Sequence, residues 1–266
     1  MQTYENLAYV SNGRTFQKLD LFVPDKGNKH PLIIWVHGGA FQRGSKKDNV
    51  PLSYLEHGFA VASLNYRLSQ HAIFPAQIED IKAATRWLRA NTKKYHLHPD
   101  CFGAWGESAG GHLVAMLGLT GNTDIFDVGE HLDIPSRVQA VADYFGPTDF
   151  LRMDSQRLPE GMAHDPHDSP ESELIGGAIQ AHKDRAAKAS PITYVTRDAP
   201  PFLIIHGDCD LLVPYQQSVI LNNALVEHGV PVSFYTVIGE CHGRFKDPKI
   251  AEITLKFFEK HLKAVI

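Results

Sequence analysis

The sequence has 266 residues, of which 43% are hydrophobic and 21% are charged, and its formal net charge is −4. This composition is ordinary for a folded globular protein and excludes a disordered chain, a collagen, a coiled coil and a small disulfide-stabilised scaffold. The small acidic excess argues against nucleic acid as a partner, because a phosphate backbone attracts basic surfaces.

Short apolar segments alternate with helical patterns along the chain, which predicts an α/β fold with a mostly parallel sheet wrapped by helices. One of these segments, PLIIWVH, has the continuous apolar character of a strand that is buried on both faces. Strands are predicted over residues 4–10, 16–23, 31–37, 59–65, 101–105, 137–145, 202–206 and 232–237, the first two as an antiparallel ribbon. Helices are predicted over residues 75–95, 215–228 and 248–262, and from the end of the 106–110 segment to residue 119.

Residues 146–199 interrupt this alternation, because they show little strand pattern and are rich in Pro, Asp, His and Ser. They lie between two predicted core strands. Long ordered segments beside a rigid sheet usually carry binding residues, so we expect a lid or pocket wall inserted in a single domain over residues 1–266. An ordinary long excursion is the alternative.

No apolar run approaches 18 residues, so we expect neither a membrane span nor a membrane partner. Residues 1–6 lack the basic and apolar regions of a signal peptide, which favours a cytoplasmic location unless a leader precedes the given sequence. The sequence does not fix the oligomeric state, and a homodimer stays open.

The sharpest motif is Gly-Glu-Ser-Ala-Gly at residues 106–110, which follows a predicted strand and precedes a predicted helix. A serine in a G-x-S-x-G turn of this kind sits on a strained elbow that exposes its hydroxyl group. The helix N-terminus below it favours the negative charge that develops on an ester oxygen during attack. Ser108 is therefore the predicted nucleophile.

A second motif, His-Gly-Gly-Ala-Phe at residues 37–41, follows a buried strand. It matches the HGGG-type loop that offers backbone N–H groups to an oxyanion, with Ala40 in place of the third glycine. The predicted oxyanion hole consists of the N–H groups of Gly39, Ala40 and Ala109. The methyl group of Ala40 is compatible with this role if the residue keeps a negative φ.

Two later segments supply an acid and a base. The strand over 202–206 leads into Asp208 and Asp210, and the carboxyl ends of strands are where ligands bind in α/β folds. Asp210 is favoured as the acid, because Asp208 has the position of a turn-stabilising residue. His242 follows the last strand and is expected to accept the Ser108 proton while its other ring N–H bonds Asp210. The chain order Ser, Asp, His is that of the α/β-hydrolases.

The chain resembles α/β-hydrolases of the hormone-sensitive-lipase-like esterase group, and within it the bacterial feruloyl and acetyl-xylan esterases. The matching segments are LDLFVP (19–24), WVHGGAF (35–41), NYRL (65–68), FPAQIEDIKAATRWLR (74–89), GESAGGHL (106–113), YFGPTDF (144–150), DSPESELIGG (168–177) and PPFLIIHGDCDLLVPYQQS (200–218). The resemblance implies an eight-stranded α/β-hydrolase fold and serine esterase activity on acyl esters, often those of plant cell-wall polysaccharides. Ala40 and the segment over 241–244 depart from the family pattern, and Arg244 bears on the shape and charge of the pocket rim.

These observations predict a serine carboxylic ester hydrolase for short-chain acyl or aromatic, feruloyl-type esters, acting through an acyl-enzyme on Ser108 without cofactor or metal. The expected partner is a small-molecule ester or a polysaccharide-linked ester. An arylformamidase-like amide hydrolase with the same triad is the alternative, and a non-catalytic binding module is disfavoured because no triad member is missing. The residues considered for the acyl pocket are Phe41, Trp105, Glu107, Tyr144, Met162, Leu212 and Val213.

Weaker signals carry separate expectations. Cys209 and Cys241 precede the predicted acid and base, and they form either a disulfide that braces the triad or two separate buried thiols. Residues 164–168 contain two histidines and two aspartates without metal-site spacing, so a solvated loop is favoured over a metal site. The Asn-Tyr-Arg segment at 65–67 is interpreted as structural, and His206 as a satisfied core residue.

Overall fold

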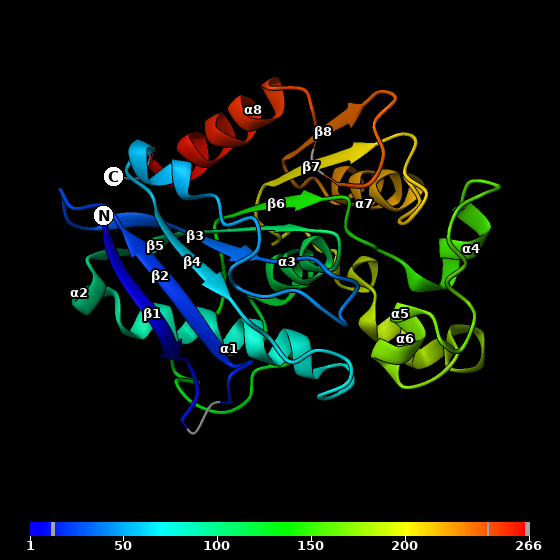
Figure 1. Ribbon diagram of the computed structural model, residues 1–266, viewed down its shortest axis with the longest axis horizontal. Helices are drawn as coiled ribbons and strands as arrows, with labels where there is room; N and C mark the ends of the chain where they lie inside the picture. The colour runs from blue at the N-terminus through cyan, green and yellow to red at the C-terminus, as the bar shows by residue number, and fades with distance from the viewer. Residues whose placement is uncertain (12–13, 244, 264–266) are drawn as a thin grey trace.

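A computed structural model describes residues 1–11, 14–243 and 245–263, and eight strands in these ranges form one sheet (Figure 1). The strands are β1 (Gln2–Ala8), β2 (Lys18–Val23), β3 (His30–Val36), β4 (Ala60–Leu64), β5 (Leu97–Glu107), β6 (Ala140–Tyr144), β7 (Phe202–Gly207) and β8 (Val232–Val237). Their order is β1-β2-β4-β3-β5-β6-β7-β8. The β1–β2 and β2–β4 pairs are antiparallel and the others are parallel, which confirms the predicted mostly parallel sheet.

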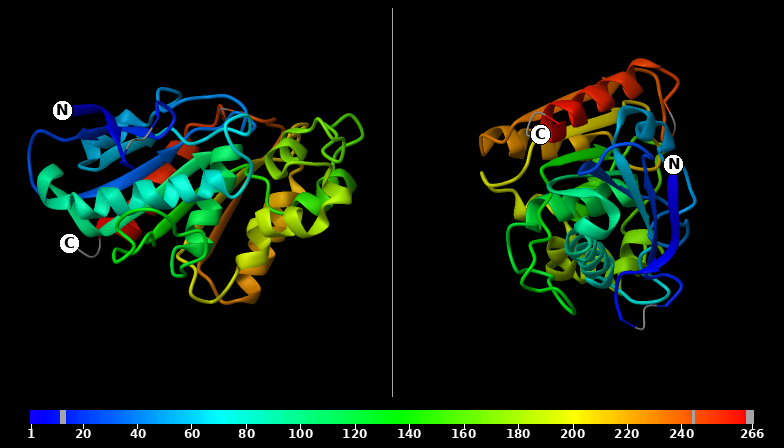
Figure 2. Two further views of the ribbon diagram at one scale, coloured as in Figure 1. Left: turned by 90° about the horizontal axis from the view of Figure 1, so that it is seen from below. Right: turned by 90° about the vertical axis from the view of Figure 1, so that its left-hand side faces the viewer.

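Helices cover both faces of the sheet (Figure 2). The main helices are α1 (Ala76–Ala90), α3 (Ala109–Thr120), α7 (Gln216–Glu227) and α8 (Lys249–Phe258), with the short helix α2 (Thr92–Tyr95), the 3-10 turn η1 (Leu52–His57) and the π-turn η5 (Glu259–Lys263). Alternate residues of β3 enter two apolar clusters: Ile34 packs with the α1, α3 and α7 side, while Ile33 and Trp35 pack with η1 and α8. Every residue of β3 is buried, and the apolar run over 31–36 thus reflects a strand covered on both faces.

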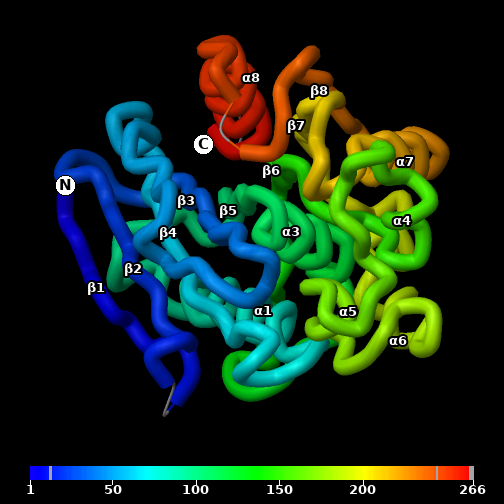
Figure 3. The backbone as a smooth tube through the Cα atoms, turned by 45° about the vertical axis from the view of Figure 1, so that its right-hand side comes forward, coloured from blue at the N-terminus to red at the C-terminus, as the bar shows by residue number. Residues whose placement is uncertain are grey.

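The 146–199 segment folds into short helical pieces beyond the ends of the parallel strands (Figures 1 and 3). These are η2 (Phe150–Arg152), α4 (Met153–Gln156), α5 (Pro170–Ile175), η3 (Ile179–Ala181), α6 (Lys183–Ala189) and η4 (Pro191–Tyr194). Ser169 caps α5, since its hydroxyl oxygen accepts a hydrogen bond from the Ser172 N–H (3.1 Å). The 146–199 segment as a whole lies beside the carboxyl edge of the sheet, which is where the wall of a pocket at that edge would lie.

Several element boundaries differ from the sequence expectation; β1, for example, covers residues 2–8 rather than 4–10, and β6 covers residues 140–144 rather than 137–145. The helix predicted over 75–95 divides at Asn91 into α1 and α2, and the left-handed His96 ends the second piece. β5 begins at Leu97 rather than at 101. The sequence pattern predicts the later start because the half-buried His98 and the exposed Pro99 and Asp100 interrupt the apolar run. Each described helix is too short or too polar to cross a bilayer.

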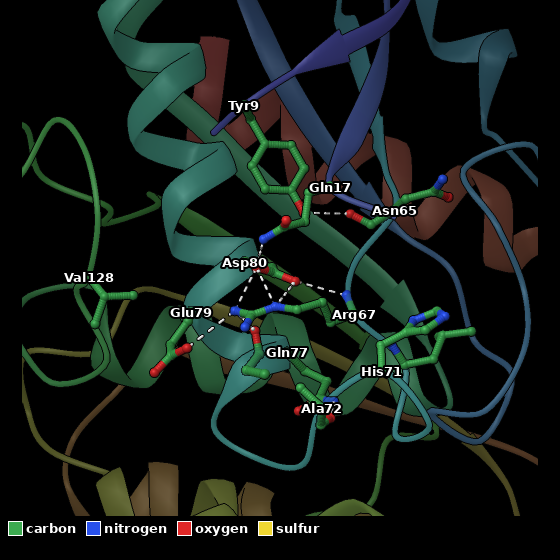
Figure 4. Close-up of polar contacts among 12 residues, drawn as sticks. Tyr9, Gln17, Asn65, Arg67, His71, Ala72, Gln77, Glu79, Asp80 and Val128 are labelled. Atoms are coloured by element: carbon green, nitrogen blue, oxygen red, sulfur yellow. Dashed lines mark hydrogen bonds and ion pairs between the residues drawn. The ribbon is translucent and has the colours of Figure 1, made fainter. Parts of the chain in front are cut away.

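The 65–67 segment is structural, as expected. Tyr66 donates a hydrogen bond from its hydroxyl group to the carbonyl of His37 (3.0 Å), and the two rings stack. The Arg67 Nε donates to both oxygens of Asp80 on α1 (3.0 and 2.9 Å), and its Nη2 also reaches Glu79 (Figure 4). This network ties the segment after β4 to α1 and to the end of β3, where the 37–41 loop begins.

Candidate active site

Ser108 occupies a strained turn between β5 and α3. Its φ of 55° and ψ of −121° lie in a region that side-chain-bearing residues rarely adopt. The turn brings backbone so close that a Cβ on Gly110 would stand 2.0 Å from the carbonyl oxygen of Val36. Only glycine fits there, so the predicted elbow is formed, and it places Ser108 at the carboxyl edge of the sheet.

Asp210 and His242 meet on the loops that follow β7 and β8. The His242 Nδ1 lies 2.7 Å from the Asp210 Oδ2, within hydrogen-bond distance. Because an ionised carboxylate only accepts, the proton of this bond belongs to Nδ1, which leaves the lone pair on Nε2. Ser108 and His242 line one cavity of about 830 Å³.

No hydrogen bond joins Ser108 to His242 among the residues that the structure describes. Catalytic hydrogen bonds of this kind often shorten only in the complex with substrate. The structure thus contains a hydrogen-bonded Asp–His pair whose histidine lines the same cavity as Ser108.

Asp210 is buried and accepts hydrogen bonds on both oxygens. Its Oδ1 accepts the backbone N–H groups of Leu212 (2.8 Å) and Val213 (2.9 Å), and its Oδ2 also lies 3.0 Å from the Nε2 of His206. Burial by itself would raise the pKa of Asp210, but the hydrogen bonds from His206 and His242 outweigh it and hold the pKa well below its ordinary value. The carboxyl group of Asp210 is therefore ionised at neutral pH.

His206 is a satisfied core residue, as expected, but it also contacts the acid. Its Nδ1 lies 2.7 Å from the Ser218 hydroxyl and its side chain is fully buried. Asp208 has the expected turn role, since its Oδ1 accepts the Gly239 N–H (2.6 Å) at the end of β8. The sequence analysis did not predict the contact between His206 and Asp210. The two residues are four positions apart at the end of β7, a separation that allows their side chains to meet.

The 37–41 loop turns sharply beside Ser108. Gly39 has φ +116°, and a Cβ there would stand 2.2 Å from the Arg43 carbonyl oxygen. Ala40 has φ +57°, so the condition that it keeps a negative φ is not met. The reason is that consecutive left-handed residues are needed to fold the loop back, a path that the Gly39 carbonyl secures by accepting the N–H groups of Gln42 and Arg43 (both 3.1 Å).

The proposed oxyanion donors line the cavity in spite of this backbone strain. Gly39, Ala40 and Ala109 all border the same cavity as Ser108. Within the described ranges, the N–H groups of these three residues donate to no protein acceptor. They are thus available to an oxygen bound beside Ser108.

The residues considered for the acyl pocket divide into two groups. Those that line the cavity with Ser108 are Phe41, Glu107, Met162, Leu212 and Val213. Trp105 and Tyr144 do not line it, which corrects the expectation that they form a pocket beside Ser108. On the α8 side of the sheet, the Trp105 ring packs against Tyr54 and Phe258, and the Tyr144 ring packs against Trp105; both border a second cavity.

The 164–168 segment is not wholly a solvated loop. His164 is buried, with its Nδ1 2.8 Å from the Glu171 carboxylate, and both residues line the cavity. The Asp154 Oδ1 accepts a hydrogen bond from the backbone N–H of His164 (2.6 Å). His167 and Asp168 are exposed, as expected. No group of His, Cys, Asp and Glu with metal-binding geometry occurs in the described part of the chain.

Cys209 and Cys241 are free thiols, so the disulfide is not formed. Both thiols are exposed rather than buried. Arg244 lies outside the described residues.

Phe145, which the sequence reasoning missed, packs edge-on against the His242 ring with centroids 4.6 Å apart. Asn49 was also missed; its Nδ2 donates to the Glu107 carboxylate (2.7 Å).

Comparison with known proteins shows that this chain is similar to esterases. The family described as BD-FAE matches residues 19–225. The protein named probable carboxylic ester hydrolase LipM, from Mycobacterium tuberculosis, is 36% identical over 192 residues, which cover 71% of this chain and 43% of that protein. The chain spans about half the length of the curated relatives it matches.

Solved structures confirm the fold. A structure described as a truncated form of a carbohydrate esterase from gut microbiota is 34% identical, with a TM-score of 0.92, over 99% of this chain and 97% of that one. The esterase Est2 of Thermogutta terrifontis is 22% identical with a TM-score of 0.77, over 97% and 91% of the two chains, and shares the fold. With the strand order above, these likenesses establish the expected α/β-hydrolase fold.

Proposed function

The chain belongs to the BD-FAE family, and we propose that it is a serine carboxylic ester hydrolase for short-chain acyl or aromatic, feruloyl-type esters. The main support is one observation: His242, which lies within hydrogen-bond distance of Asp210, lines the same cavity as Ser108 on its strained turn. A relative described as a carbohydrate esterase supports an ester carried by a polysaccharide as well as a small-molecule ester.

The proposed first step is acylation. The Nε2 of His242 takes the hydroxyl proton of Ser108 as the serine oxygen attacks the ester carbonyl carbon. The carbonyl oxygen becomes an oxyanion, which the N–H groups of Gly39, Ala40 and Ala109 stabilise, each donor contributing roughly 3–4 kcal/mol. His242 then gives its proton to the departing alcohol, and an acyl group remains on Ser108.

The second step is deacylation by water. His242 takes a proton from the water as its oxygen attacks the acyl carbon, and Ser108 leaves with that proton. Asp210 fixes the imidazole tautomer and stabilises the imidazolium in both steps. Its low pKa, which the hydrogen bonds from His206 and His242 maintain against the effect of burial, keeps it in the charged form that this role needs.

Ser108→Ala tests the proposed nucleophile. We expect kcat on an activated acyl ester to fall by about 10⁵ to 10⁶, as in triads where the nucleophile is deleted. A fluorophosphonate is expected to label the wild-type protein and not the variant, with circular dichroism showing that both are folded. Retention of a tenth of the activity by Ser108→Ala would contradict the assignment.

The two aspartates offer a matched pair. Asp210→Asn is expected to lower kcat by about 10⁴, because an amide cannot hold the tautomer of His242 in the same way. Asp208→Asn keeps an oxygen for the Gly239 N–H and is expected to stay within about tenfold of wild type. The reverse ranking in a steady-state assay would move the acid to Asp208.

A further inference from the structure

Two imidazoles meet on one oxygen of Asp210. Its Oδ2 lies 2.7 Å from the Nδ1 of His242 and 3.0 Å from the Nε2 of His206. The other oxygen, Oδ1, accepts the backbone N–H groups of Leu212 and Val213 (2.8 and 2.9 Å). An ionised carboxylate can accept about four hydrogen bonds, so these partners fill the capacity of the group.

The neighbours of the His206 ring show which of its nitrogens carries the proton. Its Nε2 faces two acceptors, the Asp210 Oδ2 and the carbonyl of Val213 (3.1 Å). An ionised carboxylate and a carbonyl have no hydrogen to donate, so the hydrogen of these contacts belongs to Nε2. In the neutral ring Nδ1 then has the lone pair, and it accepts the hydroxyl hydrogen of Ser218 (2.7 Å). The hydrogen bonds therefore run in one direction, from Ser218 through His206 to Asp210.

His206 and Ser218 both lie in the protein core. Their side chains are fully buried, and the His206 ring is the one partner of the Ser218 hydroxyl in the described part of the chain. His206 belongs to β7, and Ser218 belongs to α7, which packs on β7 (Figure 1). Neither residue lines the cavity of Ser108, so an effect on a substrate must pass through Asp210.

Aromatic rings restrict how the His206 imidazole can turn. The Tyr215 ring packs against it with centroids 5.7 Å apart, and the Phe145 ring does so at 6.2 Å. Tyr215 is itself fixed, because its hydroxyl is hydrogen-bonded to the Thr236 hydroxyl on β8 (2.6 Å). Phe145 also contacts the His242 ring, so one phenyl group packs against both imidazoles. A ring enclosed in this way keeps one orientation.

These contacts limit the rotation of the Asp210 carboxylate. The backbone bonds anchor Oδ1, but without His206 the Oδ2 atom would have His242 as its one partner among the described residues. The carboxylate could then turn about its Cβ–Cγ bond together with His242, which lies on a loop. A misplacement of about 1 Å can slow a catalysed reaction by about 100-fold. With His206 in place, Oδ2 has its position before His242 donates to it.

We propose that His206 and Ser218 are positioning residues of the triad. The Ser218 hydroxyl sets which nitrogen of His206 carries the proton, and the His206 Nε2–H holds the Asp210 carboxylate in the orientation in which it meets His242. The proposal rests on the esterase function given above. It adds two buried residues to the triad and assigns them no contact with the substrate.

Substitution of His206 tests the hydrogen bond to Asp210. His206→Leu removes the donor, whereas His206→Gln retains an N–H group near the position of Nε2. His30→Leu is the matched control, because His30 is also a buried imidazole and its Nδ1 lies 3.1 Å from the carbonyl of Gly58. It stands at the first residue of β3, whereas the candidate active site lies at the other end of the parallel strands.

We expect His206→Leu to lower kcat on an activated acyl ester by about 10- to 100-fold, with KM within about threefold of wild type, because the residue does not touch substrate. His206→Gln is expected to recover most of the lost kcat, and His30→Leu to retain the wild-type kcat. Full activity of His206→Leu, an equal loss in His206→Gln or His30→Leu, or a loss confined to KM would overturn the role.

Nitrogen NMR of protein labelled at its histidine nitrogens tests the same contacts without the esterase reaction. At a pH where the rings are neutral, we expect wild-type His206 to be the Nε2–H tautomer and wild-type His242 the Nδ1–H tautomer. Ser218→Ala is expected to populate both tautomers of His206, and His206→Leu both tautomers of His242. Ser218→Ala removes a single oxygen atom, so it decides the proposal even where His206→Leu does not fold.

Unchanged tautomers in these variants would overturn the positioning role. If the wild-type protein hydrolyses none of the esters tested, the proposed function fails, while the NMR spectra still decide whether His206 and Ser218 position the acid.

Discussion

Two buried aspartates near the site differ in charge because their partners differ. Asp210 accepts hydrogen bonds from two imidazoles and two backbone N–H groups, so its pKa is low in spite of burial. Asp143 in β6 has only the Gly146 N–H on its Oδ1 (3.0 Å), and its Oδ2 has no partner among the described residues. Burial raises the pKa of Asp143 to about 7, although the bond from Gly146 opposes this.

The raised pKa of Asp143 gives stability a definite pH dependence. The folded protein holds this proton up to about pH 7, whereas an unfolded aspartate releases it near pH 4. The folded state therefore binds more protons between these values, and the stabilisation that protonated Asp143 provides is lost as pH rises toward 7.

Asp143→Asn tests this dependence at the residue scale. The amide keeps an acceptor oxygen for the Gly146 N–H but does not ionise. We expect the unfolding free energy of the variant, relative to wild type, to increase by about 2 kcal/mol between pH 5 and pH 8, as measured by urea unfolding. A difference that is constant with pH would show that Asp143 does not titrate in this range.

At the scale of elements, the 37–41 loop combines backbone strain at Ala40 with backbone N–H groups that face the cavity of Ser108. Ala40 adopts a left-handed conformation that costs a residue with a side chain about 1–2 kcal/mol. The donor at this position is the backbone N–H, so the methyl group is not needed for the proposed chemistry.

Ala40→Gly is expected to relieve this strain and to keep the donor. Glycine also gains freedom in the unfolded chain, so the net increase in unfolding free energy is about 0.5–1 kcal/mol. We expect kcat to stay within threefold of wild type in an ester assay. Gly39→Ala is the opposing variant, because its Cβ would meet the Arg43 carbonyl at 2.2 Å, and it is expected to lose activity. A tenfold loss in Ala40→Gly would show that the methyl group shapes the site.

At the scale of the whole molecule, separate loops and the 146–199 segment enclose the cavity. The side chain of Gln42, which follows the 37–41 loop, donates to the Glu173 carboxylate on α5 (2.7 Å), and the Met162 N–H donates to the Leu211 carbonyl (2.7 Å). The segment is thus joined to both sides of the site. That it acts as a lid stays a prediction.

The free thiols of Cys209 and Cys241 predict insensitivity to reductant. A disulfide between them would close a loop of about 30 residues and stabilise the protein by roughly 3–4 kcal/mol, which corresponds to a shift in Tm of about 6–16 °C in a protein of this size. We expect Tm to agree within 2 °C with and without dithiothreitol, and Cys209→Ser to match wild type. A fall of several degrees on reduction would show that the bond forms in solution.

Features that depend on local pattern could be predicted from the amino-acid sequence alone. Continuous apolar runs predicted the buried strands, and glycine spacing around Ser108 predicted the elbow, because only glycine permits the approach of Gly110 to Val36. The contact between Asp210 and His242 was predictable in a similar way, since both follow strands whose carboxyl ends share one edge of the sheet.

Which side chains share a cavity could be seen only in the folded molecule. Trp105 and Glu107 are two residues apart on β5, yet only Glu107 reaches the cavity of Ser108, while Trp105 lies behind it among rings from other elements. The burial of His164 against Glu171 and the contact of His206 with Asp210 likewise depend on packing between distant segments. Local periodicity fixes the face on which a residue lies, but the neighbours that it meets there come from the rest of the chain.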